Sequence, residues 1–266
     1  MVTKLISLEK DISRRSSFYC KWQELATEVV WTPAIDGRNP EQVQKTMELL
    51  NISEIGELPR SYSGHRGELT PGELGCTLSH LIAIDEFLAT KNKFLFILED
   101  DAEPVDINEI NRIVEAIQEY DFDLFLLGFR KNVKPNGIVQ NLIWKTLFIL
   151  RIAKPRIDFD RFLLDSLASW KSRRHPTSRA SRTAIYSSGF HYGTYGYILN
   201  RRAAFELRHL LRTLRLRSDE AISFVNQSMR LKVITSQEPL VRVNSDFESN
   251  IRDKSAQAES FMAHGN

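Results

Sequence analysis

The chain has few cysteines, with only Cys20 and Cys76 among its 266 residues. Two thiols cannot build the disulfide framework of a small secreted domain, and such low usage is typical of a reducing compartment. Long hydrophobic runs are also missing: the nearest, at 142–153, is short and contains Lys145 and Arg151. The first residues lack the apolar core of a signal peptide. We therefore expect a cytoplasmic protein without a membrane span.

A strong net charge is absent too, since the chain carries only +2 at neutral pH, but its basic residues are unevenly spread. Residues 130–182 contain thirteen Lys or Arg against three acids, and 201–217 contain six Arg against one. Such stretches attract phosphates and anionic lipid, although a solvated basic face is the simpler alternative. No aromatic stacking platform accompanies them, so nucleic acid is not an expected partner. The residues expected at an anionic membrane surface are Lys171, Arg173, Arg174, Arg212, Arg215 and Arg217.

The most informative stretch that is present runs from Phe94 to Asp101, with the sequence FLFILEDD. Its five apolar residues predict a buried strand, and open α/β sheets bind ligands beyond the carboxyl ends of such strands. The three carboxylates that follow, Glu99, Asp100 and Asp101, repel one another and raise each other's pKa. A hard divalent cation such as Mg²⁺ or Mn²⁺ relieves that repulsion. The stretch predicts a metal–diphosphate site, with a solvated acidic turn as the alternative.

Strand-like and helix-like segments alternate along the chain, which predicts an α/β sandwich with a largely parallel central sheet. The clearest helix start is at Thr70, where Pro71 and Glu73 complete a capping box. We expect one domain over 1–247, with a basic helical insertion or lid at about 130–185 and a polar tail at 248–266. The expected strands are 2–8, 28–31, 94–98, 123–127, 193–199 and 233–235, and the expected helices are 11–26, 40–50, 71–90, 106–119, 201–214 and 218–228.

Four sequence blocks, in this order, resemble the family 25 glycosyltransferases that build bacterial lipooligosaccharide. The blocks are Leu5–Arg15 with Ala34–Gly37, then Leu69–His80, then Phe96–Asp101, and then Gly193–Tyr197 with Ser218 and Asp219 downstream. The second and third are the specific ones, and together the blocks span most of residues 1–220. The resemblance implies a GT-A-like (Rossmann-like) sandwich that binds a nucleotide sugar. It also implies transfer of galactose from UDP-galactose with inversion at the anomeric carbon.

The acidic block suits this chemistry, because the leaving diphosphate gains charge that a carboxylate-bound metal can neutralise. Asp101 matches the last acid of the family motif and is the expected direct ligand of Mn²⁺ or Mg²⁺. Glu99 lies two residues away, so in extended backbone it shares a face with Asp101 and is the expected second ligand. Glu99 or Asp100 is alternatively expected to contact the donor ribose or a metal-bound water.

An inverting transferase also needs a base that accepts the proton of the acceptor hydroxyl. Asp219 is the expected base, since it matches an acid that family members carry at this place, and Glu220 is the adjacent alternative. The sequence Ser218-Asp219-Glu220 is equally a normal helix start. Both interpretations remain open at the level of sequence.

Further residues are expected to contact the donor. The helix that begins near Pro71 offers free backbone N–H groups to an anion, with His80 farther along it as a phosphate or sugar contact or, equally, as a structural residue. Cys76 is expected only to pack in the core. Arg14 is expected to bind donor phosphate or nucleotide, unless it is a simple surface arginine. The remaining expected donor contacts are Leu8, Asp36, Gly37, Ser79, Gly193 and Thr194.

One departure from the family pattern concerns the fourth block. Many members have Gly-Thr-His-Ala-Tyr, where this chain has Tyr195 and Gly196, so a histidine that contacts metal or donor would be missing. His191 is a possible substitute. This departure leaves the complete set of metal ligands open.

The leading hypothesis is a galactosyltransferase on the inner face of the inner membrane, with UDP-galactose as donor and a lipooligosaccharide saccharide as acceptor. Within the same fold, UDP-glucose or UDP-N-acetylhexosamine is an alternative donor. From other classes, the alternatives are a metal-dependent phosphohydrolase or nuclease and a non-catalytic glycan-binding protein.

Overall fold

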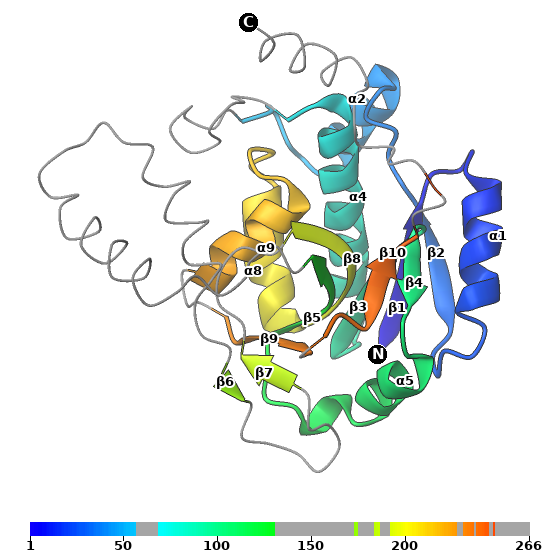
Figure 1. Cartoon of the computed structure of the whole chain (residues 1–266). Helices are drawn as coiled ribbons and strands as arrows, with labels where there is room; N and C mark the ends of the chain where they lie inside the picture. Colours follow the sequence, from blue (N-terminus) through cyan, green and yellow to red (C-terminus); the bar gives the residue numbers. More distant parts are fainter. Residues whose placement is uncertain are drawn as a thin grey trace, which may run out of the picture.

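The protein is represented by a computed structural model that describes residues 1–56, 69–130, 173–174, 184–186, 192–227, 231–236, 238–244 and 247. A ten-stranded sheet forms its centre, and helices cover both faces (Figure 1). The expected insertion at 130–185 and the tail at 248–266 lie almost entirely outside the described residues, apart from two short strands. Within the described residues, no helix combines the length and apolarity needed to cross a bilayer.

The first part of the sheet is parallel, as expected. Strand β1 (Val2–Ser7) pairs with β2 (Val29–Pro33) on one side and with β3 (Phe94–Glu99) on the other. Helix α1 (Ile12–Lys21) connects β1 to β2, and helices α2 (Pro40–Leu49) and α4 (Pro71–Leu88) lie between β2 and β3 in the chain. Each of these elements was expected from the sequence, with ends that differ by a few residues.

The second part of the chain returns to the same sheet. The helices there are α5 (Ile107–Glu115), the short 3₁₀ helix η1 (Ile117–Glu119), α8 (Arg201–Leu211) and α9 (Ser218–Gln227). The strands are β4 (Ala102–Pro104), β5 (Leu124–Arg130), β6 (Arg173–Arg174), β7 (Ala184–Tyr186), β8 (Tyr192–Asn200), β9 (Val233–Ser236) and β10 (Val241–Val243).

The expectation of a largely parallel sheet is wrong, because the sheet is mixed. Its order is β2-β1-β3-β8-β5-β9-β7-β6, with β10 pairing both β4 and β5. Strand β8 lies between β3 and β5 and is antiparallel to both. The described strands form four parallel and five antiparallel pairings. Apolar periodicity reports which residues are buried but not the direction of a strand, and β8 follows a long stretch without clear periodicity.

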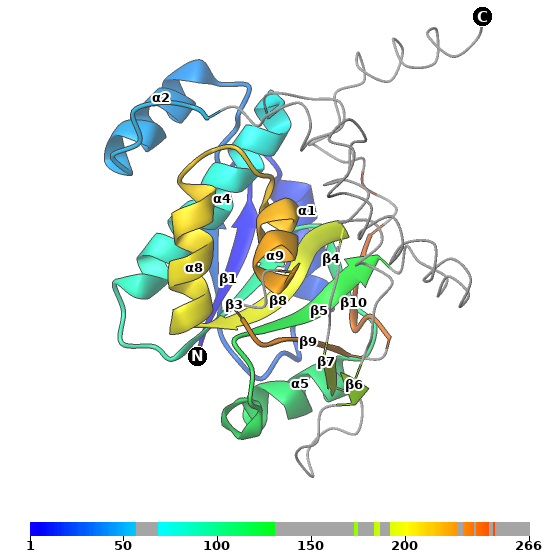
Figure 2. The ribbon, with the colours of Figure 1, turned by 90° about the vertical axis from the view of Figure 1, so that its left-hand side faces the viewer.

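Two hydrophobic cores lie on opposite faces of the sheet. Helices α2, α4, α8 and α9 cover one face, and α1 and α5 cover the other (Figure 2). Helix α4 is buried along most of its length, and its predicted capping box is confirmed. The Thr70 hydroxyl accepts from the Glu73 backbone N–H, and the Glu73 carboxylate accepts from the Thr70 N–H. The cap fixes the start of the helix that overlies the carboxyl end of β3.

Candidate functional site

The predicted acids lie where β3 ends, between helix α1 on one side and helix α4 with strand β8 on the other. Glu99 is the last residue of β3, and Asp100 and Asp101 follow in a turn. The Asp101 carbonyl accepts a hydrogen bond of 2.6 Å from the Asn244 N–H, which ties this turn to the residue after β10. Because the backbone turns after Glu99, the shared face expected from an extended chain does not apply, and the acids point to different neighbours.

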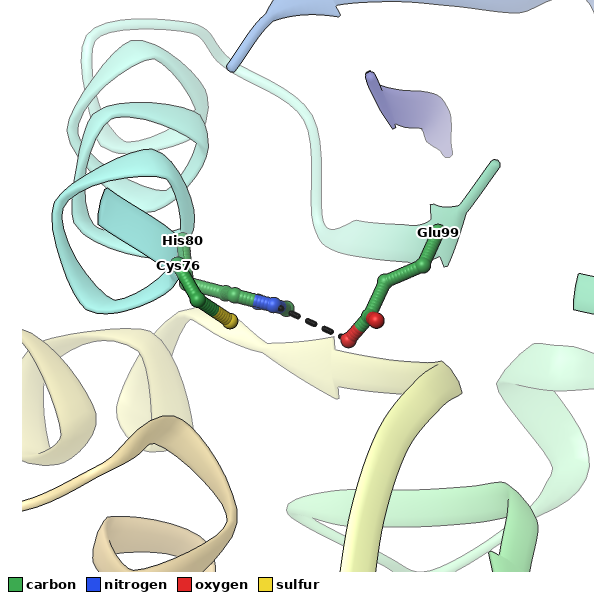
Figure 3. A group of neighbouring side chains, drawn as sticks. All are labelled: Cys76, His80 and Glu99. Carbon is green, nitrogen blue, oxygen red and sulfur yellow. Dashed lines mark hydrogen bonds and ion pairs between the residues drawn. The ribbon is translucent and has the colours of Figure 1, made fainter. Parts of the chain in front are cut away.

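Glu99 is held from the side of α4 and β8. One carboxylate oxygen, Oε1, accepts a hydrogen bond of 2.5 Å from the Thr194 hydroxyl and lies 3.3 Å from His80 Nε2 (Figure 3). His80 Nδ1 lies 2.8 Å from the Tyr197 hydroxyl. Burial alone would raise the pKa of Glu99, but the hydrogen bond and charge of His80, with the Thr194 hydroxyl, hold it below its ordinary value. Glu99 is therefore an oriented anion.

Asp100 is held from the side of α1. Arg14 is 9% exposed, and its Nε donates to Asp100 Oδ1 over 2.8 Å. Its terminal nitrogen NH2 lies 2.5 Å from the same oxygen and 3.2 Å from Asp101 Oδ2. Burial raises the pKa of Asp100, and the Arg14 charge opposes that rise. Sequence reasoning placed Arg14 at the donor phosphate, whereas in the structure its guanidinium lies against the acidic turn.

Asp101 differs from its neighbours because one of its oxygens is unsatisfied. Oδ1 is buried and has no hydrogen-bond partner within the described part of the chain. Burial, followed by the negative charge of Glu99, raises the pKa of Asp101 to about 7, and Arg14 partly opposes this. Buried acceptors normally have a partner, so this carboxylate oxygen is available to a ligand that carries a donor or a positive charge. Oxygen donors are those that Mg²⁺ and Mn²⁺ prefer, so the residues present fit such an ion.

Asp219 lies in the first turn of α9 and reaches the fourth sequence block. Its Oδ2 accepts a hydrogen bond of 3.2 Å from the Gly193 N–H, and Gly193 has a positive φ of 89°. Arg217 Nε lies 3.9 Å from the other carboxylate oxygen. Burial raises the pKa of Asp219, while Arg217 and the Gly193 N–H lower it. The structure thus brings Asp219 and Gly193 together, as a shared site requires.

Glu220, the alternative base, is engaged by Arg217, the residue just before α9. Its carboxylate accepts from the Arg217 backbone N–H over 3.0 Å and from the Arg217 guanidinium over 2.5 Å. These contacts satisfy the free end of α9, which is the helix-start interpretation of this sequence. They also engage Arg217, which was expected at a membrane surface, in an ion pair with Glu220. Of the two acids, Asp219 has the environment better suited to a base.

Several residues expected at the donor hold the turn after β2 against α4. The Ser79 hydroxyl donates to the Gly75 carbonyl over 2.6 Å and accepts from the Ile35 N–H over 2.8 Å. A Cβ on Gly37 would lie 1.7 Å from the Pro71 carbonyl oxygen, so only glycine fits there. These contacts give Ser79 and Gly37 a structural role, and a donor contact by either remains a prediction.

The two remaining expected donor residues lie at the carboxyl ends of β1 and β2. Asp36 forms an ion pair of 2.5 Å with Lys10, and this hydrogen bond lowers its pKa. Leu8 is half-buried, and its carbonyl accepts a hydrogen bond from the Arg15 guanidinium. Both residues therefore lie at the edge where the resemblance places the nucleotide.

Tyr195, which stands where many relatives have histidine, packs on the other face of the sheet from His80. A Cβ on Gly128 or Gly193 would meet its ring at 2.6 Å or 2.1 Å, so the ring lies across both glycines. It is 6% exposed and belongs to the core beneath α1 and α5. The candidate substitute, His191, lies outside the described residues.

Sequence reasoning missed Cys76 as a neighbour of the site. Cys76 and His80 are four residues apart on α4, and both side chains point toward Glu99 (Figure 3). Burial raises the pKa of the Cys76 thiol well above its usual range, and the charges of Glu99, Asp219 and Asp101 add to that rise. The thiol is thus within electrostatic reach of all three acids. The i, i+4 spacing of Cys76 and His80 was the signal available in the sequence.

Comparisons with known proteins bear on this site. The sequence model of "Glycosyltransferase family 25 (LPS biosynthesis protein)" matches residues 1–222. A "Glycosyltransferase 25 family member" of Aedes aegypti is 32% identical over 132 residues, which are 48% of this chain and 21% of that protein. The mouse "Inactive glycosyltransferase 25 family member 3" is 31% identical over 135 residues, 49% of this chain and 22% of that protein. The chain therefore spans about a fifth of the length of these curated relatives.

Solved structures are only distantly similar. The crystal structure of A197 from STIV has a TM-score of 0.36 and 11% identity, and the alignment covers 96% of this chain and 100% of that one. The galactosyltransferase LgtC, in complex with donor and acceptor sugar analogs, has a TM-score of 0.39 and 9% identity, with coverages of 99% and 95%. The family match, in contrast, includes the acidic turn, the capped helix, the Gly193 block and Asp219. On that match, this chain belongs to glycosyltransferase family 25.

Proposed function

We propose that the protein is a metal-assisted, inverting glycosyltransferase with a GT-A-like fold. Its donor would be UDP-galactose and its acceptor a saccharide of lipooligosaccharide or lipopolysaccharide. Family membership supports sugar transfer, and the family's description supports the acceptor class. The observation that carries the proposal is the orphaned Asp101 oxygen, which lies at the carboxyl end of β3 beside a second carboxylate. UDP-glucose and UDP-N-acetylhexosamine remain alternative donors.

In this proposal, Asp101 and Glu99 would hold Mn²⁺ or Mg²⁺. The bound ion would supply positive charge to the diphosphate as it leaves. Arg14 neutralises Asp100 and touches Asp101, so it keeps the acidic turn folded before an ion binds. His80 and Thr194 fix the orientation of Glu99.

Asp219 would act as the base. The acceptor hydroxyl oxygen forms a bond to the anomeric carbon, the bond from that carbon to the diphosphate oxygen breaks, and the hydroxyl proton passes to the Asp219 carboxylate. Burial raises the pKa of Asp219, which makes its carboxylate a stronger base than an exposed aspartate. The Gly193 N–H donates one hydrogen bond to Oδ2 of Asp219.

The proposed location is the cytoplasmic face of a membrane, where an acceptor of this class would be anchored. Of the basic residues expected there, Arg217 is engaged by Glu220, and Arg212 donates to the Asn51 carbonyl over 3.1 Å. Lys171 lies outside the described residues. Sedimentation with vesicles that contain anionic lipid would test this location, because binding that depends on anionic lipid and falls with added salt is the expected result.

The test of the activity is UDP release from a panel of UDP-sugars, with and without Mn²⁺, using glucose-terminated and lactose-type acceptors. Release from a single donor that requires both metal and acceptor would support the proposal. Asp219→Asn should then lose activity, whereas Glu220→Gln, a matched change one residue away, should keep most of it. Phosphodiester cleavage without any acceptor would favour a phosphohydrolase. Saccharide binding without UDP release by folded protein would favour a non-catalytic protein.

A further inference from the structure

The side of α4 that faces the sheet presents a thiol and an imidazole next to the carboxylate of Glu99. Cys76 Sγ, one ring nitrogen of His80 and one Glu99 oxygen all lie within 4.8 Å of one another. Two of these ligand atoms come from consecutive turns of one helix and the third from the end of β3, so they approach one point from two elements (Figure 3). The His80 side chain is fully buried, and that of Glu99 is 17% exposed.

The spacing is close to that of a tetrahedral metal site. Zinc bonds of about 2.0–2.3 Å place neighbouring ligand atoms about 3.5 Å apart. His80 Nε2 and Glu99 Oε1 already lie 3.3 Å apart. A side-chain movement of about an ångström would bring the Cys76 sulfur to the same separation, since the three atoms already lie within 4.8 Å.

The surrounding hydrogen bonds would support bound metal. Metal-binding histidines usually donate their other ring N–H to a fixed partner, and His80 Nδ1 lies 2.8 Å from the Tyr197 hydroxyl. That hydroxyl can donate or accept, so it remains bonded whichever tautomer His80 adopts. Thr194 donates to the Glu99 oxygen and leaves it further lone pairs.

We propose that Cys76, His80 and Glu99 form a site for a thiophilic divalent cation such as Zn²⁺. It shares Glu99 with the hard-ion position proposed at Asp101 and differs from it in the ligands Cys76 and His80. Thiolate and imidazole favour zinc over Mg²⁺ or Mn²⁺, which prefer the all-oxygen surroundings of Asp101. Binding forms bonds from the metal to Sγ, Nε2 and a Glu99 oxygen, and the thiol proton passes to solvent. Three protein ligands leave a fourth position for water or for a ligand group. The bound ion would also join α4 to β3.

The test uses the full chain after treatment with a chelator, with Zn²⁺ measured by calorimetry and Co²⁺ by absorption. One Co²⁺ per chain should give a tetrahedral spectrum with a sulfur-to-cobalt charge-transfer band, and Zn²⁺ should abolish it. Cys76→Ser preserves size and should remove that band and weaken Zn²⁺ binding by about 100-fold or more. The melting curve of the metal-free variant checks that it folds.

Two control variants make the assignment specific. Cys20→Ser removes the exposed cysteine of α1 and should keep the charge-transfer band and the Zn²⁺ affinity. Asp101→Asn should keep both as well, because the proposed site does not use Asp101.

Tyr197→Phe should weaken Zn²⁺ binding by about 10-fold, since it removes the partner of His80 Nδ1. Any of three results would overturn the proposal. They are unchanged Zn²⁺ affinity in folded Cys76→Ser, loss of the charge-transfer band in Cys20→Ser, and the absence of stoichiometric Co²⁺ binding to the unmodified chain.

Discussion

Each end of the central sheet holds an aspartate with a buried carboxylate oxygen, but the two carboxylates have different surroundings. At one end, just before β5, Asp123 accepts at Oδ1 from Asn200 over 3.0 Å and at Oδ2 from the Lys232 N–H over 2.8 Å and Arg202 over 3.2 Å. At the other end, after β3, Asp101 has one oxygen near Arg14 and one with no partner in the described part of the chain. A carboxylate with all its partners supports the fold, whereas an oxygen that lacks a partner is open to a ligand, as we propose for Asp101.

The largest expected difference between the two aspartates is in activity, which should depend on Asp101 and not on Asp123. If Asp101 holds the proposed ion, Asp101→Asn should lower Mn²⁺-dependent UDP release by at least about 100-fold, because it removes the carboxylate that would hold the ion beside the leaving diphosphate. The measurement is steady-state UDP release together with calorimetric binding of UDP and Mn²⁺. Asp123→Asn is the matched control and should keep its activity per folded molecule. Equal donor affinity in Asp101→Asn and the unmodified protein would remove Asp101 from the metal role.

Stability, in contrast, should depend more on Asp123 than on Asp101. Asp123→Asn should lower the free energy of unfolding by about 2–3 kcal/mol, because an amide cannot accept from Asn200, Lys232 and Arg202 together and leaves a buried donor unpaired. Urea unfolding followed by circular dichroism measures this change. If Asp101→Asn cost as much as Asp123→Asn in the absence of metal, the distinction between the two ends of the sheet would fail.

A third prediction concerns how the free energy of unfolding of the metal-free protein depends on pH. The pKa of Asp101 is about 7 in the folded state against an ordinary value of 3.8, so the folded state binds its proton more tightly than the unfolded state. The resulting stability is present below about pH 4 and is lost as the pH rises toward 7. Asp101→Asn should therefore gain stability relative to the unmodified protein, by up to about 1.4 kcal/mol per pH unit, as the pH rises from 4 to 7. Unfolding free energies of both proteins with chelator present test this, and a difference independent of pH would contradict it.

The smallest expected effect concerns a helix cap on the side of the site. Thr70→Ala should lower the free energy of unfolding by about 1 kcal/mol, since it removes the hydroxyl that caps α4. Asn39→Ala removes the equivalent cap of α2, where Asn39 accepts from the Gln42 N–H, and should cost a similar amount. Comparing UDP affinity in the two variants sharpens the result. Weaker binding in Thr70→Ala alone would indicate that the start of α4 contacts the donor.

Local signals in the sequence were sufficient for much of this structure. The capping box at Thr70 and the apolar run before Glu99 depend on neighbouring residues, and both are confirmed. The direction of β8 was not predictable, because it depends on how the chain returns after residue 130. Periodicity assigned burial correctly on both sides of that return and gave no indication of strand order.

The residues of the candidate site were easier to predict from the sequence than the contacts that they make. The acidic turn, His80 and Asp219 were expected, and the structure places Glu99 beside His80 and Asp219 against Gly193. The burial of Arg14 against Asp100 was not expected, since an arginine on a short helix is usually solvated. Cys76 was predicted only to pack in the core, because its neighbour Glu99 is distant in sequence. Contacts between such residues require the tertiary fold.

The position of β8 has a consequence for how the chain folds. Strands β3 and β5 are complete by residue 130, but they do not pair with each other, and the strand between them begins at Tyr192. During synthesis, both strands therefore have an open edge until some sixty further residues have been made, at a rate of roughly 5–20 residues per second. Unpaired edges of this kind attract other chains. Insertion of β8 should thus be a late step in folding, with association between nascent chains as its main competitor.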